Sequence, residues 1–154
     1  MSRWLRVFSA SMHAPAPAEL LAYLRELAGE ALGNFQGDDQ GWFRADLDLG
    51  GAGRSIRLER YLATEEGIRH ELNAWAAWVE TFENHHAHDF LMKHLTATTQ
   101  IFTLQSPPVG ESAGSMDDLQ VGLCRFVAKE TAGVYQVDGQ GFFSSDGELL
   151  LAEE

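Results

Sequence analysis

Residues Gly33 to Asp46, G-N-F-Q-G-D-D-Q-G-W-F-R-A-D, decide how the chain is organised, because a related stretch follows one hundred residues later. Gly133 to Asp146 reads G-V-Y-Q-V-D-G-Q-G-F-F-S-S-D. Aligned without a gap, the two stretches share seven identical positions and keep two further positions aromatic. Self-similarity at a fixed spacing is typical of an internal repeat. We interpret the stretches as a duplication, the alternative being chance similarity between two turns rich in Gly, Gln and Asp.

The similarity extends upstream of both stretches, where three identical pairs occur at the same offset: Arg25/Arg125, Ala28/Ala128 and Glu30/Glu130. Hydrophobic periodicity predicts a strand, a helix and two strands in each copy. The predicted units are β-α-β-β, over residues 4–63 and 100–152, with a helical linker over 64–95. The predicted fold is a single α+β domain over residues 1–154, with antiparallel sheet covered by helices.

Two arrangements satisfy this element order. In the first, the two units pair about a pseudo-twofold axis; this resembles, in organisation only, the tandem small-molecule-binding domains of the GyrI-like kind. In the second, the first six elements form a ferredoxin-like β-α-β-β-α-β core, followed by a C-terminal helix and hairpin. The sequence leaves both arrangements open.

Charge and cysteine content restrict the class of partner. The net charge is −12, from 23 acidic and 11 basic residues of which two are lysines, so nucleic acid is not expected as a partner. A basic protein or a small cationic ligand suits this charge better, although acidity also serves solubility. No run of about 20 apolar residues and no secretion signal occurs, so no membrane association is expected. The single cysteine, Cys124, favours a reducing, cytoplasmic location.

No catalytic motif can be assigned. Cys124 occupies an apolar position of a predicted helix, which is typical of a core residue, and no cofactor motif is expected. The segment E-N-H-H-A-H-D offers His85, His88 and Asp89 as metal ligands at helical spacing. The competing interpretation is a polar segment between two helices, because helical periodicity fails there.

Binding candidates lie on the predicted outward side of the first sheet: Trp4, Arg6, Phe8, Trp42, Arg44, Arg57 and Tyr61. Arginine and aromatic side chains are enriched in protein interfaces. The competing interpretation is that the helix from Glu65 to Phe82 covers this face, with Trp75 and Trp78 packing on it. A second candidate is a cleft between the two repeats, lined by Asp38, Asp138, Trp42 and Phe142.

Two functions therefore follow from the sequence as hypotheses. The first is a non-enzymatic protein-binding module of the immunity or antitoxin type, which would bind a basic partner. The second is a small-molecule sensor with its ligand between the repeats. An enzyme comes third, because no acid, base or nucleophile is assigned.

Overall fold

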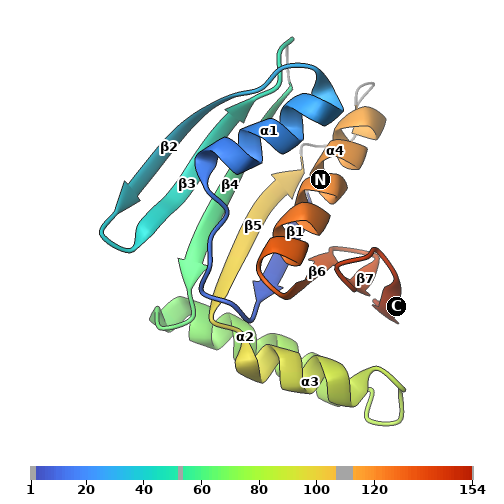
Figure 1. Cartoon of the computed structure of the whole chain (residues 1–154). Coiled ribbons are helices and arrows are strands. Elements are labelled where there is room, and N and C mark those ends of the chain that lie inside the picture. Colours follow the sequence, from blue (N-terminus) through green and yellow to red (C-terminus); the bar gives the residue numbers. More distant parts are fainter. Residues whose placement is uncertain (1–2, 52–53, 107–112, 154) are drawn as a thin grey trace.

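A computed structural model describes residues 3–51, 54–106 and 113–153. Figure 1 shows the elements along the chain, which are β1 (Arg3–Ser9), α1 (Pro17–Ala28), β2 (Leu32–Asp38), β3 (Gly41–Asp48), β4 (Ser55–Leu62), α2 (Glu66–Glu80), α3 (His88–Ala97), β5 (Gln100–Ser106), α4 (Ala113–Glu130), β6 (Gly133–Val137), β7 (Gly141–Phe143) and β8 (Leu149–Ala152). The predicted α+β class is confirmed.

All eight of these strands form one antiparallel sheet in the order β2-β3-β4-β5-β1-β6-β7-β8. The centre of the sheet is the pair β1 and β5, in which Val7 lies opposite Phe102. Residues 7–9 of β1 and 100–104 of β5 are buried at consecutive positions, as expected for strands with helices on both faces.

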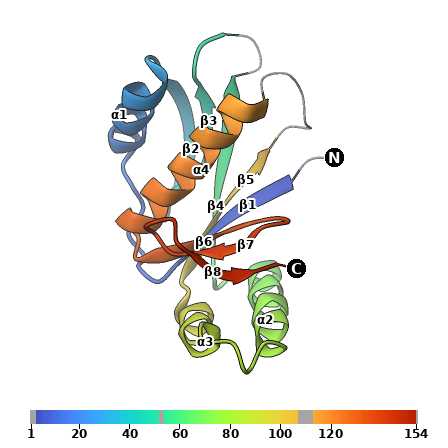
Figure 2. The same cartoon turned by 90° about the vertical axis from the view of Figure 1, so that its right-hand side faces the viewer.

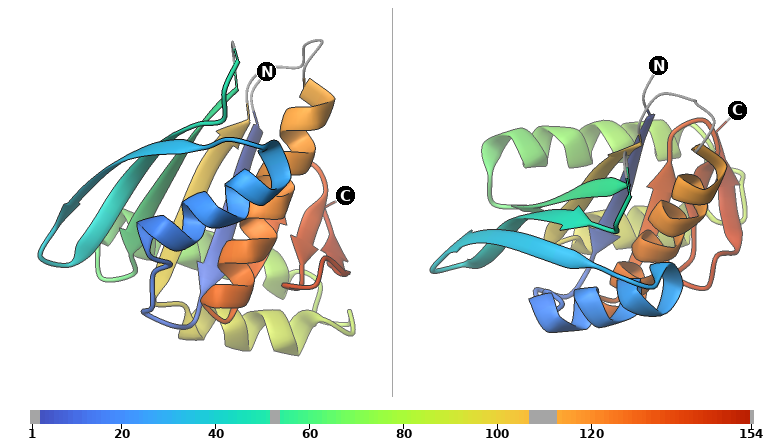
Figure 3. Two further views of the ribbon diagram at one scale, coloured as in Figure 1. Left: turned by 45° about the horizontal axis from the view of Figure 1, so that its top comes forward. Right: turned by 90° about the horizontal axis from the view of Figure 1, so that it is seen from above.

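The sheet separates two hydrophobic cores. The front face packs against α1 and α4, with Leu5, Val7 and Phe102 in its core. The back face packs against α2 and α3, with Phe8 and Ile101 in its core. Figure 2 and the right panel of Figure 3 show α1 and α4 on one side of the strands and α2 on the other. Helices α2 and α3 lie across one end of the sheet in Figure 1, which leaves the other end of the back face without a helix.

Each half of the chain has one strand more than predicted. Residues Leu32 to Asp38, interpreted from sequence as a turn, form strand β2 and pair with β3. This strand is exposed at every position except the half-buried Phe35. A strand at the edge of a sheet is held by backbone hydrogen bonds on one side only, so it does not need the alternating apolar pattern that would reveal it.

The internal duplication is not confirmed by the sheet. The two halves do follow the same order of strands and helix. The three strands after α1 join the sheet through their last strand, β4, which pairs with β5. The three strands after α4 join the centre of the sheet through their first strand, β6, which pairs with β1. A twofold axis would require equivalent strands at both junctions, so the pseudo-twofold arrangement is wrong.

The ferredoxin-like alternative is not followed either. That arrangement pairs the first strand with the third strand of the core, which here would join β1 to β4. Strand β1 instead lies between β5 and β6, and β4 pairs with β5. Helices α1 and α2 also lie on opposite faces of the sheet (Figure 3).

A β-bulge changes the orientation of two aromatic residues in β3. The alternating pattern predicts Phe43 inward and Trp42 outward. In the structure, Gln36 lies opposite Arg44 but Gly37 lies opposite Trp42, so Phe43 is the extra residue of the bulge. Trp42 is 9% exposed in the front core and Phe43 is 42% exposed. One additional residue reverses the face of every side chain beyond it.

Candidate functional site

The back face of the sheet has an apolar end and a polar end. At the apolar end, Trp75 of α2 packs edge-on against Phe8, with ring centroids 6.2 Å apart, and against Phe142 at 5.5 Å. Trp78 stacks on Phe142 at 6.1 Å. The interpretation that this helix covers the face is therefore confirmed for Phe8, which is fully buried. Trp4, Arg6, Arg44 and Arg57 lie farther toward the uncovered end, whereas Tyr61 lies opposite Ile101, which pairs with Phe8.

The polar end carries two neighbouring rows of side chains that run across the strands. Registers between adjacent strands align Arg44, Glu59, Thr103, Arg6 and Gln136 in the first row. The second row contains Asp46 opposite Arg57, and Trp4 beside Asp138. We call these nine residues the polar patch: Trp4, Arg6, Arg44, Asp46, Arg57, Glu59, Thr103, Gln136 and Asp138.

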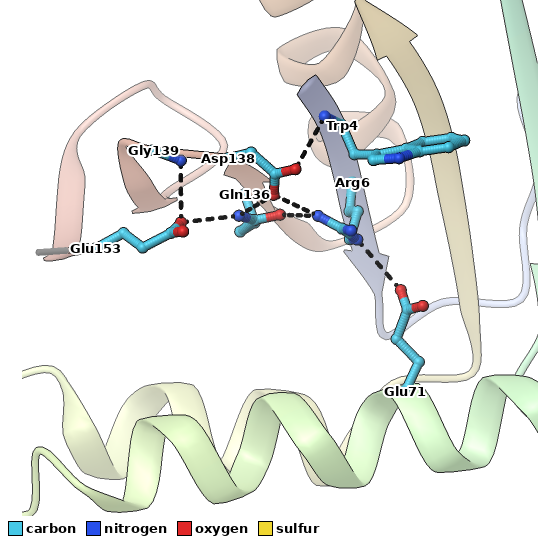
Figure 4. A network of polar contacts seen from close by, with 7 residues as sticks. All are labelled: Trp4, Arg6, Glu71, Gln136, Asp138, Gly139 and Glu153. Atoms are coloured by element: carbon cyan, nitrogen blue, oxygen red, sulfur yellow. Dashed lines mark hydrogen bonds and ion pairs between the residues drawn. The ribbon is translucent and has the colours of Figure 1, made fainter. Parts of the chain in front are cut away.

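Arg6 organises one half of the polar patch (Figure 4). Its Nη1 donates to Gln136 Oε1 and to Asp138 Oδ1, both at 2.7 Å, and its Nε donates to Glu71 Oε2 of α2 at 3.2 Å. The guanidinium also lies 5.2 Å from the centroid of the Trp75 ring. Arg6 thus links strands β1 and β6 to helix α2, and its charge is compensated by two carboxylates.

Asp138 is held by three donors. Partial burial raises the pKa of this carboxyl, but hydrogen bonds from Gln136, from the backbone N–H of Trp4 and from Arg6 outweigh burial, so the pKa lies below its ordinary value. The Trp4 N–H reaches Asp138 Oδ2 at 3.0 Å. Asp138 is therefore an ionised acceptor at neutral pH that fixes the edge of the patch.

The other half of the patch is an arginine–aspartate cluster. Asp46 accepts from Arg57 Nε at 2.9 Å and from Arg44 Nε at 3.2 Å. The hydrogen bond from Arg57 is the main reason that the pKa of Asp46 lies below its ordinary value. Arg57 nevertheless keeps 55% of its side chain exposed. The guanidinium groups are thus oriented by Asp46 and remain accessible.

Thr103 lies at the centre of the polar patch, between Arg6 and Glu59 on the adjacent strands. It is 9% exposed, and its hydroxyl has no hydrogen-bond partner within the described part of the chain. Buried polar atoms are nearly always paired in folded proteins. Because this oxygen is buried, a partner would contact the more exposed Arg44 and Arg57 of the patch and not the Thr103 hydroxyl itself.

The structure brings most of the predicted binding residues onto one face. Five of the predicted residues alternate along their strands with residues of the front core and therefore lie on the back face: Trp4, Arg6, Arg44, Arg57 and Tyr61. Burial, followed by the neighbouring Glu59 carboxylate, raises the pKa of Tyr61.

The prediction that Trp42 lies on this face is wrong, and so is the prediction that Trp42 and Asp38 line a shared cleft. Trp42 lies in the front core, where its Nε1 donates to Pro15 O at 2.8 Å. Asp38 is exposed at the tip of the β2–β3 hairpin and accepts from Gln40 N. Phe142 lies in the back core, on the other side of the sheet from Trp42. The predicted cleft is therefore not formed by these residues.

Arg60 is a buried cation that sequence reasoning did not identify. It is 6% exposed and donates to three neutral acceptors, Gln100 Oε1 at 2.6 Å, Trp42 O at 2.9 Å and Gln40 O at 3.2 Å. Burial lowers the pKa of Arg60, against the opposing effect of the Asp38 and Glu65 charges. The sequence does carry a signal for this burial, because Arg60 occupies a position of β4 at which alternation predicts an inward side chain.

The predicted metal ligands are engaged in other contacts. His88 is hydrogen-bonded through Nδ1 to Asp89 and through Nε2 to Glu80. These hydrogen bonds raise the pKa of His88, and the bond to Asp89 has the larger effect. His85 Nδ1 accepts from Ala87 N at 3.0 Å. The described residues hold one group with metal-ligand spacing, the exposed side chains His13, Glu19 and Glu130, whose ligand atoms lie within 4.8 Å of one another.

A pocket of about 110 Å³ lies between α2 and α3. This volume is well below the several hundred Å³ that small-molecule sites usually occupy. Its lining is Arg69, Leu72, Asn73, Ala76, Leu95, Thr96 and Thr98. Cys124 is buried in the front core, and burial raises the pKa of its thiol, so it is an inert core residue.

Comparison of the chain with protein-family models, curated proteins and solved structures finds no match. Within the described ranges, no helix has the length and apolar character needed to cross a membrane. The geometry of the site therefore carries the functional argument.

Proposed function

We propose that the chain is a non-enzymatic protein-binding module whose docking surface is the polar patch. The observation that carries this proposal is the arginine–aspartate cluster of the patch, in which Asp46 orients the guanidinium of Arg57 while 55% of the Arg57 side chain stays exposed. Trp4 and Arg44 belong to the same face, and tryptophan and arginine are frequent anchors of protein interfaces.

The charge of the molecule supports a basic partner. Within the patch, three arginines are balanced by Asp46, Glu59 and Asp138, so the patch itself supplies directional contacts. The chain as a whole carries −12, which would attract a basic protein from a distance and raise its association rate. This combination suits an immunity or antitoxin type of protein, acting in the cytoplasm where a single buried cysteine stays reduced.

We place protein binding ahead of the small-molecule sensor because the residues expected to line a ligand cleft are separated. Trp42 and Phe142 belong to different cores, and the patch lies toward the end of the sheet that α2 and α3 leave uncovered (Figure 1). A charge-balanced sheet face suits a macromolecule better than a small cation.

The test is co-purification of the tagged chain from its source cells at low salt. The double variant Trp4→Ala/Arg57→Ala removes two anchors of the patch, and Lys93→Ala on the exposed side of α3 is the matched control. We expect the wild type and the control to retain the same basic protein, and the double variant to lose it. Equal retention by all three, or no retained protein at low salt, would overturn the proposal.

A further inference from the structure

Strand β2 is an open sheet edge of unusual composition. It has seven residues, and Leu32 to Gln36 pair without interruption with β3 on one side (Figure 1). The opposite edge strand, β8, has four residues and is flanked by Glu148 and Glu153. Soluble proteins normally protect long edge strands with lysine, proline or inward-pointing charge. Strand β2 contains none of these, and its single charged residue, Asp38, stands at its end.

Apolar side chains accompany this open edge. Leu32 is 68% exposed, and Phe43 of the neighbouring strand is 42% exposed. Phe35 is half-buried on the front face, where it meets Trp42 edge-on with ring centroids 5.8 Å apart. The left panel of Figure 3 shows the β2–β3 hairpin extending beyond α1, so no helix covers the outer side of β2.

The sequence of β2 is self-complementary in antiparallel pairing. When L-G-N-F-Q-G-D is paired with a second copy about Phe35, Gly33 lies opposite Gly37 and Asn34 lies opposite Gln36. Phe35 then meets its own copy on the front face, and the two amide pairs lie on the back face. Directly opposed aromatic and amide pairs stabilise antiparallel strands, and this register opposes no like charges.

We propose that two copies of the chain associate through antiparallel pairing of their β2 strands, which joins the two sheets into one about a twofold axis. The association is isologous, because each copy contributes the same strand and the same register. Each copy carries −12, so repulsion opposes association and added salt strengthens it. The dimer leaves the back-face polar patch available to another protein.

Two charge variants test the register. In Asn34→Lys/Gln36→Lys, each new lysine lies opposite a lysine of the second copy. In Asn34→Lys/Gln36→Glu, the same positions pair lysine with glutamate. Both positions are exposed, and because Gln36 lies opposite Arg44 of β3, thermal melting checks that β2 stays in the sheet in both variants. Sedimentation equilibrium of the full chain from about 1 μM to about 1 mM, at low and at moderate salt, measures the dimer over the range of weak affinities.

We expect the wild type and the lysine–glutamate variant to dimerise, more strongly at moderate salt, and the lysine–lysine variant to remain a monomer with intact folding. A wild type that is monomeric at every concentration would overturn the proposal. Equal dimerisation of the two variants would also overturn it, because the interface would then lie elsewhere. Neither outcome depends on the partner protein of the polar patch.

Discussion

Arg60 shows how one buried charge can fix several segments of the chain. Removing a guanidinium from water is costly unless its donors are satisfied. Here Gln100 accepts from Arg60 and donates in turn to the carbonyls of Ser11 and His13, both at 2.7 Å. Arg60 also donates to the carbonyls of Gln40 and Trp42. The network ties the loop after β1 and the β2–β3 hairpin to the sheet.

Arg60→Met should destabilise the protein by about 2–3 kcal/mol, because three acceptors, two of them in buried contacts, would lose their donor. The matched control is Arg57→Met on the same strand, where the side chain is 55% exposed and the expected change is within about 0.5 kcal/mol. Urea unfolding of both variants measures the difference. Equal effects of the two substitutions would contradict the role assigned to Arg60.

Asp138→Asn should lower the free energy of unfolding at neutral pH by about 1–2 kcal/mol, because the ion pair with Arg6 is lost. The pKa of Asp138 lies below its ordinary value in the folded protein. Its stabilising effect is therefore complete above the unfolded pKa, about 3.9, and disappears as the pH falls through the lower folded pKa. Unfolding measured from neutral to acidic pH should show the two proteins converging below about pH 4. A constant difference across this range would argue against the linkage.

At the scale of single elements, the alternation of side chains predicts the buried face of β1 and β4, but the pairing of β3 with β2 overrides it. Alternation in β1 and β4 correctly assigned Trp4, Arg6, Arg57 and Tyr61 to one face. The same rule failed in β3, because the bulge at Phe43 cannot be recognised from apolar periodicity. The aligned residues Trp42 and Phe142 consequently lie on opposite faces, although their sequence contexts are alike.

Trp42→Ala should cost about 3–5 kcal/mol, since it removes a buried ring and the hydrogen bond to Pro15. Phe43→Ala, one residue away, should change stability by less than about 1 kcal/mol because that ring is 42% exposed. Chemical denaturation of the pair tests the bulge directly. The reverse order of effects would mean that β3 follows simple alternation.

At the scale of the whole molecule, the burial of Cys124 makes global opening measurable. The thiol is 1% exposed between α4 and the sheet, and burial raises its pKa. A thiol reagent reacts with the thiolate, so modification requires the front core to open.

We expect a disulfide-exchange reagent to leave Cys124 unmodified in the native protein and to modify it at a rate that rises with denaturant. The unfolded chain provides the control for full reactivity. Fast modification under native conditions, with circular dichroism unchanged, would show that the packing of α4 is looser than the structure indicates.

The sequence by itself determined most helices, most strands and the residues of the polar patch on β1 and β4. This was possible because side-chain periodicity reports whether a segment is helical or extended, and which side is buried. The central Thr103 was missed, since an isolated threonine in a strand carries no signal of an unpaired hydroxyl.

Only the tertiary structure decided the order of the strands, the edge position of β2 and the face on which Trp42 lies. Strand pairing is made by backbone groups that every residue shares, so closely similar stretches such as 33–46 and 133–146 can join a sheet through different strands. The resemblance between those stretches predicted the order of elements in each half. It could not predict their partners, because the partners of a strand depend on the rest of the fold.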